Sequence, residues 1–475
     1  MSDLTFLTAV NMADQIREKK ISPVELADAH LAKIERLNPR LNAFVHVDAE
    51  RVRREARAAE AAVMSGKVLG PLHGVPISIK SSLDVAGLRC ESGSRLRAGH
   101  IATHDAPLVD RLRHAGAIVL GVTNAPELLM AWETDNLLYG RTNSPWDLDR
   151  TPGGSSGGEA AAIAAGMSAG GVGSDGGGSI RVPAHFCGIC GLKPTPGRIP
   201  ATGHVPASGG PFALLGVVGP MARTVGDVKD LFDVMQGWDD GDSCAAPVPM
   251  RWPGDDEVKK LRVGYFETDG RTPVTAEIRA AVRTAAEALR SAGFEVEPFR
   301  PEGLEEARVL WKKFFVTAGG MLIRPMFSGR EHDLSPILKQ FLEWSAAELP
   351  LSGVTLLDAW IGRDILRAKF LAQMRKYPIL LCPAAAIPAF HHGERCWTID
   401  GKTVNYLDAW SYTEWFNLLG NPAAVVPVSH SVAGEWEGLP IGVQVVGRPW
   451  QEEQVLAVAA VLERACGAWR IPPIH

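Results

Sequence analysis

Two kinds of hydrophobic pattern follow one another along this chain, and the first is helical. Charged amphipathic stretches over residues 22–39 and 48–64 predict two helices. The first begins with a serine cap at Ser22, a proline in the first turn, and Glu25 three positions after the cap. The second ends at Ser65-Gly66, a typical helix stop. We expect these helices to cover the molecule and not to form a site.

From residue 70 the pattern changes to apolar runs bounded by glycine. A short strand is predicted over 75–80, and a helix over 105–115 is followed by a glycine and an apolar strand over 117–122. The same helix-glycine-strand unit recurs over 275–292 and 294–298. This alternation predicts an α/β protein in which helices cover the faces of a sheet.

The back half of the chain is more varied. Residues 237–259 are rich in Asp, Gly and Pro and predict a surface connection, whereas 303–370 are mostly helical and carry many large apolar side chains. We interpret the aromatic side chains of this segment first as core, with the lining of a substrate pocket by part of it as the alternative. Strands and a closing helix are then predicted at 378–381, 423–428, 441–446 and 451–466.

Composition and charge exclude several classes of protein. With 46% hydrophobic and 22% charged residues, the 475-residue chain can bury a large core. Its net charge of −5 argues against a general nucleic-acid binder, so no nucleic-acid partner is expected. We expect no secretory signal, because the first residues lack a basic region followed by an apolar run, and no membrane span, because no apolar stretch is long enough. Seven cysteines, an odd number, fit free thiols in the cytoplasm. The sequence leaves open a monomer or a homodimer.

The candidate chemistry lies in two glycine-rich blocks and one lysine. Residues 153–158 read GGSSGG, residues 173–181 read GSDGGGSIR, and Lys80 closes the apolar strand of 74–80. Serine needs a base to become a nucleophile, and glycines leave backbone N–H groups free for an anion. These are the parts of a hydrolase that uses serine and lysine. We expect Arg181 to pair with the nearby acid of the second block and brace its loop.

Two other motifs fit the same glycines less well. Residues 171–176 match G-x-G-x-x-G, but the region about 20 residues on has no acid and two prolines, so a nucleotide site is not favoured. Residues 153–157 match G-x-S-x-G, yet the preceding 147–152 are polar and not an apolar strand. A Ser-His-Asp esterase of the α/β-hydrolase type therefore stays a further alternative.

The cysteine and histidine motifs do not indicate a metal site. Cys187 and Cys190 form a C-x-x-C without the second pair that zinc requires, so we interpret them as small buried residues in a tight turn. His73 and the pair at 391–392 are interpreted as structural or solvated histidines. No metal is expected.

Together the blocks resemble the amidase signature family. The similarity is carried by residues 74–80, 151–159, 173–184, 188–195, 219–224, 417–423 and 438–444. It is strongest from 70 to 235 and weak from about 237 to 370. The resemblance implies a single large domain over 1–475, with a central mixed β-sheet covered on both faces by helices.

Within that domain we expect four regions. They are an N-terminal helical cover (1–66), the signature core (70–235), a variable region that shapes the substrate site (237–420), and a C-terminal sheet and helix (421–475).

The resemblance also assigns roles to single residues. It implies Ser179 as the nucleophile that accepts the acyl group, Ser155 as a bridging serine on a cis peptide bond, and Lys80 as the base. The oxyanion hole would consist of the amides of Gly176, Gly177, Gly178 and Ser179. Supporting residues would be Ser156, Asp175 and Arg181. The chain departs from the family pattern at Ser81, Ser174 and Gly176, none of which removes a catalytic group.

This Ser-Ser-Lys triad implies an amidohydrolase that needs no metal or organic cofactor. Its substrate would be a small or medium, partly apolar amide, with esters or carbamates as side substrates. Lys80 would act as a neutral amine, because burial lowers the pKa of a lysine. The family also contains fatty-acid-amide-hydrolase-like enzymes and the glutaminase subunit of tRNA-dependent amidotransferases. That glutaminase is the first alternative, and an inactive relative that serves as a binding protein is another.

Overall fold

The protein is built on one large mixed β-sheet, seen in a computed structural model that describes residues 3–207, 209–348, 351–467 and 469–474. Eleven strands follow the order β1-β3-β2-β4-β6-β5-β12-β13-β9-β7-β8, and β10 and β11 form a separate hairpin. The strands are β1 Phe44–Val47, β2 Pro76–Lys80, β3 Ile118–Thr123, β4 Gly170–Asp175, β5 Cys190–Lys193, β6 Val217–Ala222, β7 Val263–Tyr265, β8 Val296–Pro298, β9 Ile379–Pro383, β10 Cys396–Ile399, β11 Lys402–Asn405, β12 Ala423–His430 and β13 Pro440–Val446.

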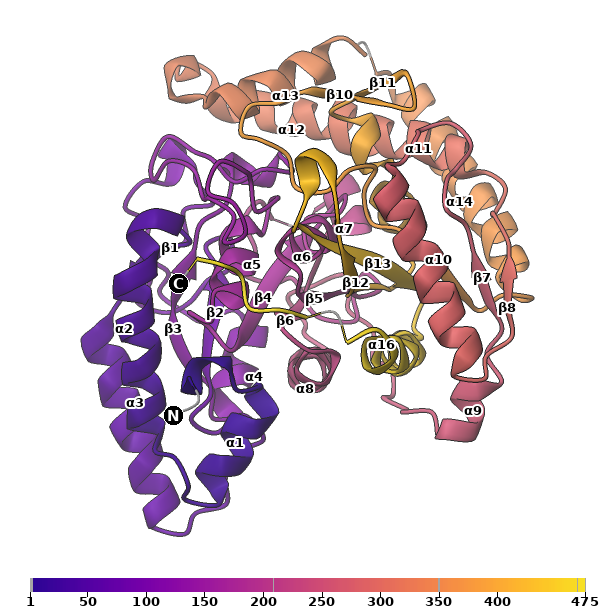
Figure 1. Cartoon of the computed structure of the whole chain (residues 1–475). Coiled ribbons are helices and arrows are strands. Elements are labelled where there is room, and N and C mark those ends of the chain that lie inside the picture. Colours follow the sequence, from indigo (N-terminus) through magenta and orange to yellow (C-terminus); the bar gives the residue numbers. More distant parts are fainter. Residues whose placement is uncertain (1–2, 208, 349–350, 468, 475) are drawn as a thin grey trace.

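Helices cover both faces of the sheet (Figure 1). The α-helices are α1 Ala9–Arg17, α2 Pro23–Leu41, α3 Ala49–Met64, α4 Pro107–His114, α5 Gly157–Ala164, α6 Arg181–Cys187, α7 Pro211–Leu215, α8 Val225–Met235, α9 Asp255–Lys259, α10 Ala276–Ser291, α11 Leu304–Lys312, α12 Gly319–Ile323, α13 Pro336–Ala346, α14 Gly353–Gln373, α15 Ser411–Leu418 and α16 Glu452–Cys466. Helices α5 and α6 pack on one face, and α8, α10 and α16 pack on the other. This confirms the expected α/β domain with a central mixed sheet.

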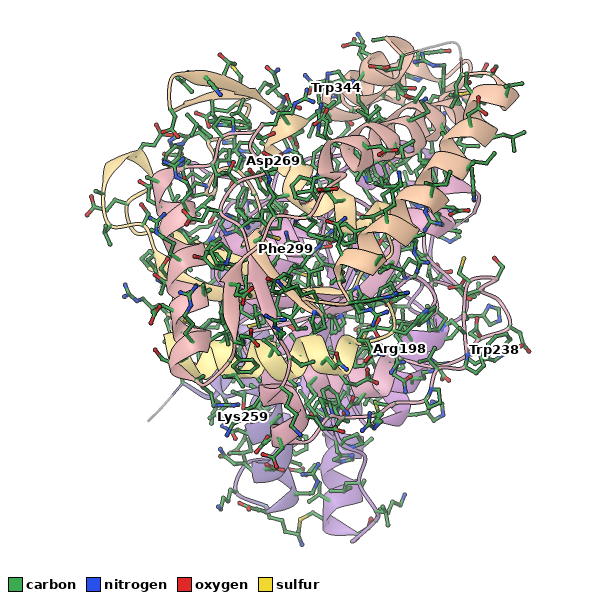
Figure 2. The ribbon with its side chains drawn as sticks, turned by 90° about the vertical axis from the view of Figure 1, so that its right-hand side faces the viewer. Arg198, Trp238, Lys259, Asp269, Phe299 and Trp344 are labelled. Atoms are coloured by element: carbon green, nitrogen blue, oxygen red, sulfur yellow. The ribbon has the colours of Figure 1, made fainter. Side chains whose placement is uncertain are left out.

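Most helices and strands form where the hydrophobic pattern predicts them. Helix α2 begins with the predicted capping box, in which the Ser22 side chain and Glu25 satisfy each other's backbone N–H groups. Strands β2 and β3 are parallel neighbours, and every residue of both is buried. The predicted surface connection is also present, although its last residues form the short helix α9. Figure 2 shows Trp238 and Lys259, near the two ends of this connection, at the periphery of the molecule.

The glycine block contains an element that the pattern does not predict. Residues 170–175 form the buried strand β4, paired to β2 and β6, so the loop begins only at Gly176. Two of its glycines permit the close approach of α5. A Cβ on Gly171 would lie 2.0 Å from Glu159 Oε1, and one on Gly173 would lie 2.8 Å from Ser156 Oγ. Glycine is usually unfavourable in a strand, and here the missing side chains make room for a helix.

Helices α11 to α14 form a separate layer over one end of the sheet (Figure 1). The first of them continues into a π-helical segment, Lys313–Ala318. This layer confirms that the 303–370 region is mostly helical, and it carries aromatic side chains toward the glycine loop that follows β4.

Candidate active site

The amine of Lys80 is within hydrogen-bond distance of three serine hydroxyls. Lys80 is the last residue of β2, an inner strand of the sheet, and its side chain is fully buried. Its Nζ lies 2.7 Å from Ser155 Oγ and 3.0 Å from both Ser156 Oγ and Ser174 Oγ. The structure therefore brings the predicted lysine to the predicted bridging serine. The contacts with Ser156 and Ser174 were not predicted from the sequence.

Burial dominates the ionisation of this lysine. Loss of hydration lowers the pKa of Lys80 well below its usual range, while the charges of Asp175 and Glu159 act in the opposite direction. No acid is adjacent to Lys80 in the sequence, so only the folded chain brings these two carboxylates near it. Both carboxylates come from distant segments, one on β4 and one on α5.

Glu159 is a buried acid to which the sequence analysis assigned no role. Its Oε1 accepts a hydrogen bond from Ser78 Oγ at 2.5 Å, and its Oε2 accepts one from Thr123 Oγ1 at 2.7 Å. Burial raises its pKa to about 7, against the lowering effect of these hydrogen bonds and of Lys80. Ser78 and Lys80 are two residues apart on β2 and so share a face, which is the one sequence signal for this cluster.

Ser155 lies in the turn between the polar loop and α5. The Gly154–Ser155 peptide bond is cis, as the family resemblance implied. Gly154 is pressed against the backbone of Glu133, where a Cβ would lie 2.3 Å from the Glu133 carbonyl oxygen. The amide of Ser156 donates to the carbonyl of Ser179 at 3.1 Å, which ties this turn to the second glycine block.

Ser179 lies at the end of the glycine loop, with 8% of its surface exposed, and lines the same cavity as Ser155. In the described part of the chain, no hydrogen bond joins the hydroxyls of Ser155 and Ser179. The predicted relay contact is therefore not formed in this structure. Such catalytic hydrogen bonds often tighten only when substrate is bound. Neither hydroxyl is bonded to a histidine among the described residues, which argues against the Ser-His-Asp alternative.

The expected pairing of Arg181 with Asp175 is present. Arg181 Nη2 and Nε lie 3.0 Å from Asp175 Oδ1 and Oδ2, and both side chains are fully buried. The carboxylate also accepts from the amides of Gly178 at 2.7 Å and Ile180 at 3.1 Å. Burial alone would raise the pKa of Asp175, but Arg181 and these amides hold it below its ordinary value. The pair braces both ends of the loop.

Three residues of the back half complete this brace. Arg181 Nη1 donates to the Thr413 carbonyl at 2.9 Å and to Gln444 Oε1 at 2.8 Å, and Nη2 donates to Asn417 Oδ1 at 2.5 Å. Asn417 and Gln444 belong to sequence blocks that resemble the family, but nothing in the local sequence predicts their role. With these bonds every charge of the buried pair is satisfied.

The loop amides are not equivalent. The amide of Gly178 donates to Asp175 and is already satisfied. The amides of Gly176, Gly177 and Ser179 have no hydrogen-bond partner within the described residues. Of the four expected oxyanion donors, three are therefore free to bind a ligand.

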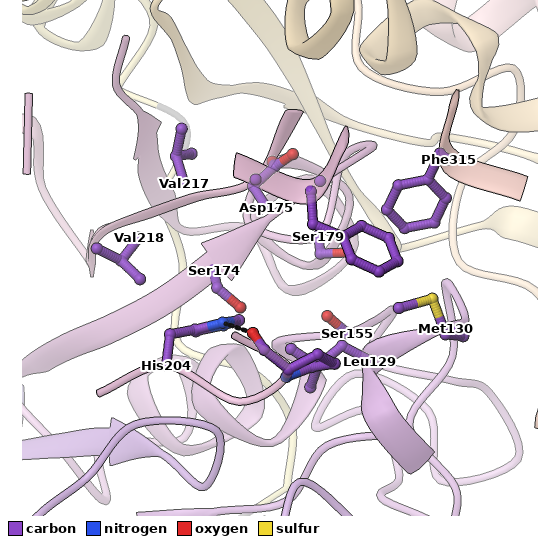
Figure 3. A pocket seen from close by; sticks show the side chains of 14 residues that line it. Leu129, Met130, Ser155, Ser174, Asp175, Ser179, His204, Val217, Val218 and Phe315 are labelled. Atoms are coloured by element: carbon purple, nitrogen blue, oxygen red, sulfur yellow. Dashed lines mark hydrogen bonds between the residues drawn. The ribbon is translucent and has the colours of Figure 1, made fainter. Parts of the chain in front are cut away.

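A cavity of about 480 Å³, part of it open to solvent, lies over these groups. Figure 3 shows Ser155, Ser174 and Ser179 around it, with Phe315 and Met130 to one side and His204 to the other. A smaller cavity beside it is lined by Trp132, Gly177, Phe315 and Phe341, among others. Phe315 and Phe341 of the aromatic 303–370 segment line these cavities, whereas Trp311 and Phe314 are buried in the core, as the first interpretation of this segment expects. The larger cavity is bounded by Leu129, Met130, Ser155, Ser174, Asp175, Gly176, Ser179, His204, Pro206, Phe212, Gly216, Val217, Val218 and Phe315.

The C-x-x-C motif lies away from this cavity. Cys187 ends α6, Cys190 begins β5, and a glycine in the left-handed conformation turns the chain between them. Both thiols are buried, and burial raises their pKa. This confirms their interpretation as small structural residues. No cluster of His, Cys, Asp or Glu able to hold a metal ion occurs in the described ranges.

Fold and site together place a buried lysine against serine hydroxyls at the edge of one cavity. A family model described as Amidase matches residues 25–456, and the chain belongs to this family. The protein is thus a hydrolase of amide C–N bonds. Within the ranges that the structure describes, no helix combines the length and apolar character needed to span a membrane.

Similar proteins include more than one activity. The chain is 34% identical to the acylamidase of Rhodococcus erythropolis, over 97% of this chain and 96% of that one. It is 33% identical to one component of the glutamyl-tRNA(Gln) amidotransferase of Moorella thermoacetica, over 98% and 97%. Among solved structures, 6-aminohexanoate cyclic dimer hydrolase complexed with substrate matches with a TM-score of 0.86 and 30% identity, covering 99% of each chain.

Proposed function

We propose that this protein is a free-standing amidase that cleaves small or medium, partly apolar amides through an acyl-enzyme on Ser179. One observation carries the proposal. A fully buried lysine amine lies 2.7 Å from Ser155 Oγ, and Ser155 and Ser179 line the same cavity. The members of the triad come from β2, the turn before α5, and the loop after β4.

Lys80 is the base, and only its neutral form can accept a proton. A neutral amine has two N–H donors and one lone pair. With its donors directed to Ser156 and Ser174, the lone pair accepts the proton of Ser155. Ser155 in turn takes the proton of Ser179 as that hydroxyl attacks the substrate carbonyl.

The oxyanion formed in this step is stabilised by backbone N–H groups. The free amides of Gly176, Gly177 and Ser179 serve as donors, while Gly178 holds the loop on Asp175. Loss of one oxyanion donor typically costs about 3–4 kcal/mol of transition-state stabilisation.

The same groups complete the reaction. The relay returns its proton to the leaving amine, so the C–N bond breaks and the acyl group stays on Ser179. Water then attacks the ester and gives one proton to the relay. The C–O bond to Ser179 breaks, the relay passes that proton to Ser179 Oγ, and the carboxylic acid is released. Esters and carbamates follow the same path as side substrates.

The cavity wall supports an apolar substrate group. It is formed mainly by Leu129, Met130, Phe212, Val218 and Phe315, and its two titratable side chains are His204 and the paired Asp175. No arginine or lysine occurs among the described residues that line it. A glutaminase needs a partner for the α-carboxylate of glutamine, so this wall favours a free-standing amidase over the glutaminase of an amidotransferase.

The test is an activity panel on the isolated chain. We expect hydrolysis of simple aryl and alkyl amides without partner proteins or tRNA, and its loss in Ser179→Ala by roughly 10⁴-fold or more. Ser82→Ala is the matched control, because this buried hydroxyl has no hydrogen-bond partner among the described residues. Full activity of Ser179→Ala would refute the nucleophile. Hydrolysis of glutamine only in the presence of partner proteins would favour the glutaminase alternative.

Two further points concern the inactive-relative alternative and the location of the protein in the cell. The presence of Lys80, Ser155 and Ser179 argues against an inactive binding protein. We place the protein in the cytoplasm, since its seven cysteines are all unpaired in the described part of the chain.

A further inference from the structure

Two tryptophans outside the glycine blocks hold the carbonyl groups of the loop that follows β4. The indole N–H of Trp311, on α11, donates to the Gly176 carbonyl at 2.9 Å. The indole N–H of Trp132 donates to the Gly177 carbonyl at 2.9 Å. Both rings are almost completely buried, and their centroids are 5.9 Å apart.

The other carbonyls of the loop are also bonded. Asn417 Nδ2 donates to the Asp175 carbonyl at 3.0 Å, and the amide of Val182 donates to the Gly178 carbonyl at 2.7 Å. The Ser179 carbonyl accepts from the amide of Ser156. Every peptide plane of the loop is therefore held from its carbonyl side.

A fixed carbonyl also fixes the next amide. The C=O and N–H groups of a trans peptide point in opposite directions, and the described cis bonds lie elsewhere, at 154–155 and 205–206. The bond from Trp311 to the Gly176 carbonyl thus directs the Gly177 N–H away from the indole. The cavities touch Gly176, Gly177 and Ser179, whereas Trp311 lines neither of them.

The indole ring is also in steric contact with the loop. A Cβ on Gly177 would lie 2.5 Å from Trp311 Cζ2, so only glycine allows the ring this close. The Phe315 ring stacks on the Trp311 indole, with their centroids 4.8 Å apart. The segment that supplies the apolar wall therefore also supports the loop.

We propose that Trp311 is a positioning residue that orients the Gly177 amide toward the oxygen of the scissile carbonyl, while Trp132 holds the peptide plane that follows Gly177. This inference rests on the proposed function, because it assumes that the loop amides bind the oxyanion. The energetic benefit is preorganisation, since donors that are already aimed need no rearrangement in the transition state.

The experiment compares Trp311→Phe with Trp410→Phe. Trp410 is the matched control: it is fully buried and its ring stacks 5.8 Å from that of Trp132, but its N–H has no partner among the described residues. We expect Trp311→Phe to lower kcat by about 10- to 100-fold and to leave KM within about threefold. The affinity for an aryl trifluoromethyl ketone, which forms a tetrahedral adduct with serine, should fall in parallel with kcat. Trp410→Phe should change neither.

A second route covers the case in which Trp311→Phe does not fold. Thr413 Oγ1 lies 2.9 Å from the Gly177 carbonyl and 2.8 Å from the Trp410 carbonyl, and its single proton serves one acceptor at a time. The double variant Trp132→Phe/Thr413→Val removes both donors to the Gly177 carbonyl and so loosens the peptide plane that follows Gly177. It should also lower kcat with little change in KM, by less than about 10-fold because the Gly178 amide of that plane stays bonded to Asp175. An unchanged kcat would count against positioning of the loop through its carbonyls.

The outcomes separate this inference from the proposed function. A folded Trp311→Phe variant with kcat near that of the wild type, or with a raised KM alone, would overturn the positioning role. If Ser179→Ala is inactive at the same time, the amidase mechanism stands and only this inference fails. If Ser179→Ala keeps its activity, the mechanism itself fails.

Discussion

The two sides of the active site are built on opposite principles. The side formed by residues 153–181 consists of small residues, and glycines such as Gly171 and Gly173 let helix and strand approach closely. The side formed by the α11 to α13 region consists of large aromatic residues, among them Trp311, Phe315 and Phe341. The first side carries hydroxyls, amides and the brace, and the second carries apolar surface.

This difference separates the reaction from its substrate. The small-residue side holds Lys80, Ser155 and Ser179 and resembles the family strongly, and in the proposed mechanism it carries out the amide hydrolysis. The aromatic side resembles the family weakly and shapes the cavity in which the amide is bound. The indole of Trp311 connects the two, because it belongs to the aromatic side and is bonded to the glycine loop.

The largest effect is expected from removing the base on the small-residue side. Lys80→Met should lower kcat by roughly 10²–10⁴-fold, the usual contribution of a general base. Lys193→Met is the matched control, since Lys193 is also a fully buried lysine but bonds to the Pro194 carbonyl. Single-turnover acylation measures the effect. An unchanged acylation rate in Lys80→Met would remove this lysine from the mechanism.

The same variant has a predicted pH signature in stability. Because burial lowers the pKa of Lys80, the folded state binds fewer protons than the unfolded state below the ordinary lysine value of 10.5. Stability of the wild type should then rise with pH between the folded and unfolded pKa values. Lys80→Met removes this dependence, so its gain in Tm at neutral pH should shrink as the pH approaches 10.5. A constant difference in Tm across this range would contradict a neutral buried lysine.

The next-largest effect is expected from breaking the buried ion pair of Asp175 and Arg181, which ties the glycine loop to the back half of the chain. Arg181→Gln leaves the Asp175 carboxylate buried without its charge partner, which should lower the free energy of unfolding by about 3–5 kcal/mol. Urea unfolding measures it. The double variant Asp175→Asn/Arg181→Met, which buries no charge, should recover part of the loss. A single variant as stable as the wild type would show that the pair does not support the fold.

The smallest effect is expected on the aromatic side. Phe315→Leu removes part of the wall and should raise KM for small aromatic amides by about 10-fold, with little change in kcat. Phe314→Leu is the control, because Phe314 is buried against Trp360 and does not line the cavity. If Phe315→Leu instead lowers kcat alone, the division between a reacting side and a binding side is wrong.

Local sequence predicted many of the elements and the groups that the site brings together. Capping residues and apolar periods were sufficient for α2, α3, β2 and β3, because these signals act within a few residues. Strand β4 was missed because its glycines have no hydrophobic pattern. The close approach of neighbouring segments, among them Glu159 of α5 and Met221 of β6, explains them. The hairpin of β10 and β11 was missed as well.

What the sequence by itself determined is the set of reactive groups: two serines, a lysine and glycine amides in blocks that resemble one family. What only the tertiary structure decided is the state of those groups. Lys80 and Ser155 are hydrogen-bonded although 75 positions separate them in the sequence, and Arg181 and Gln444 are hydrogen-bonded across 263 positions. Burial and distant carboxylates set the pKa of the lysine, and indoles from other segments hold the loop carbonyls. A pKa and a hydrogen bond depend on neighbours in space, which are known only once the chain has folded.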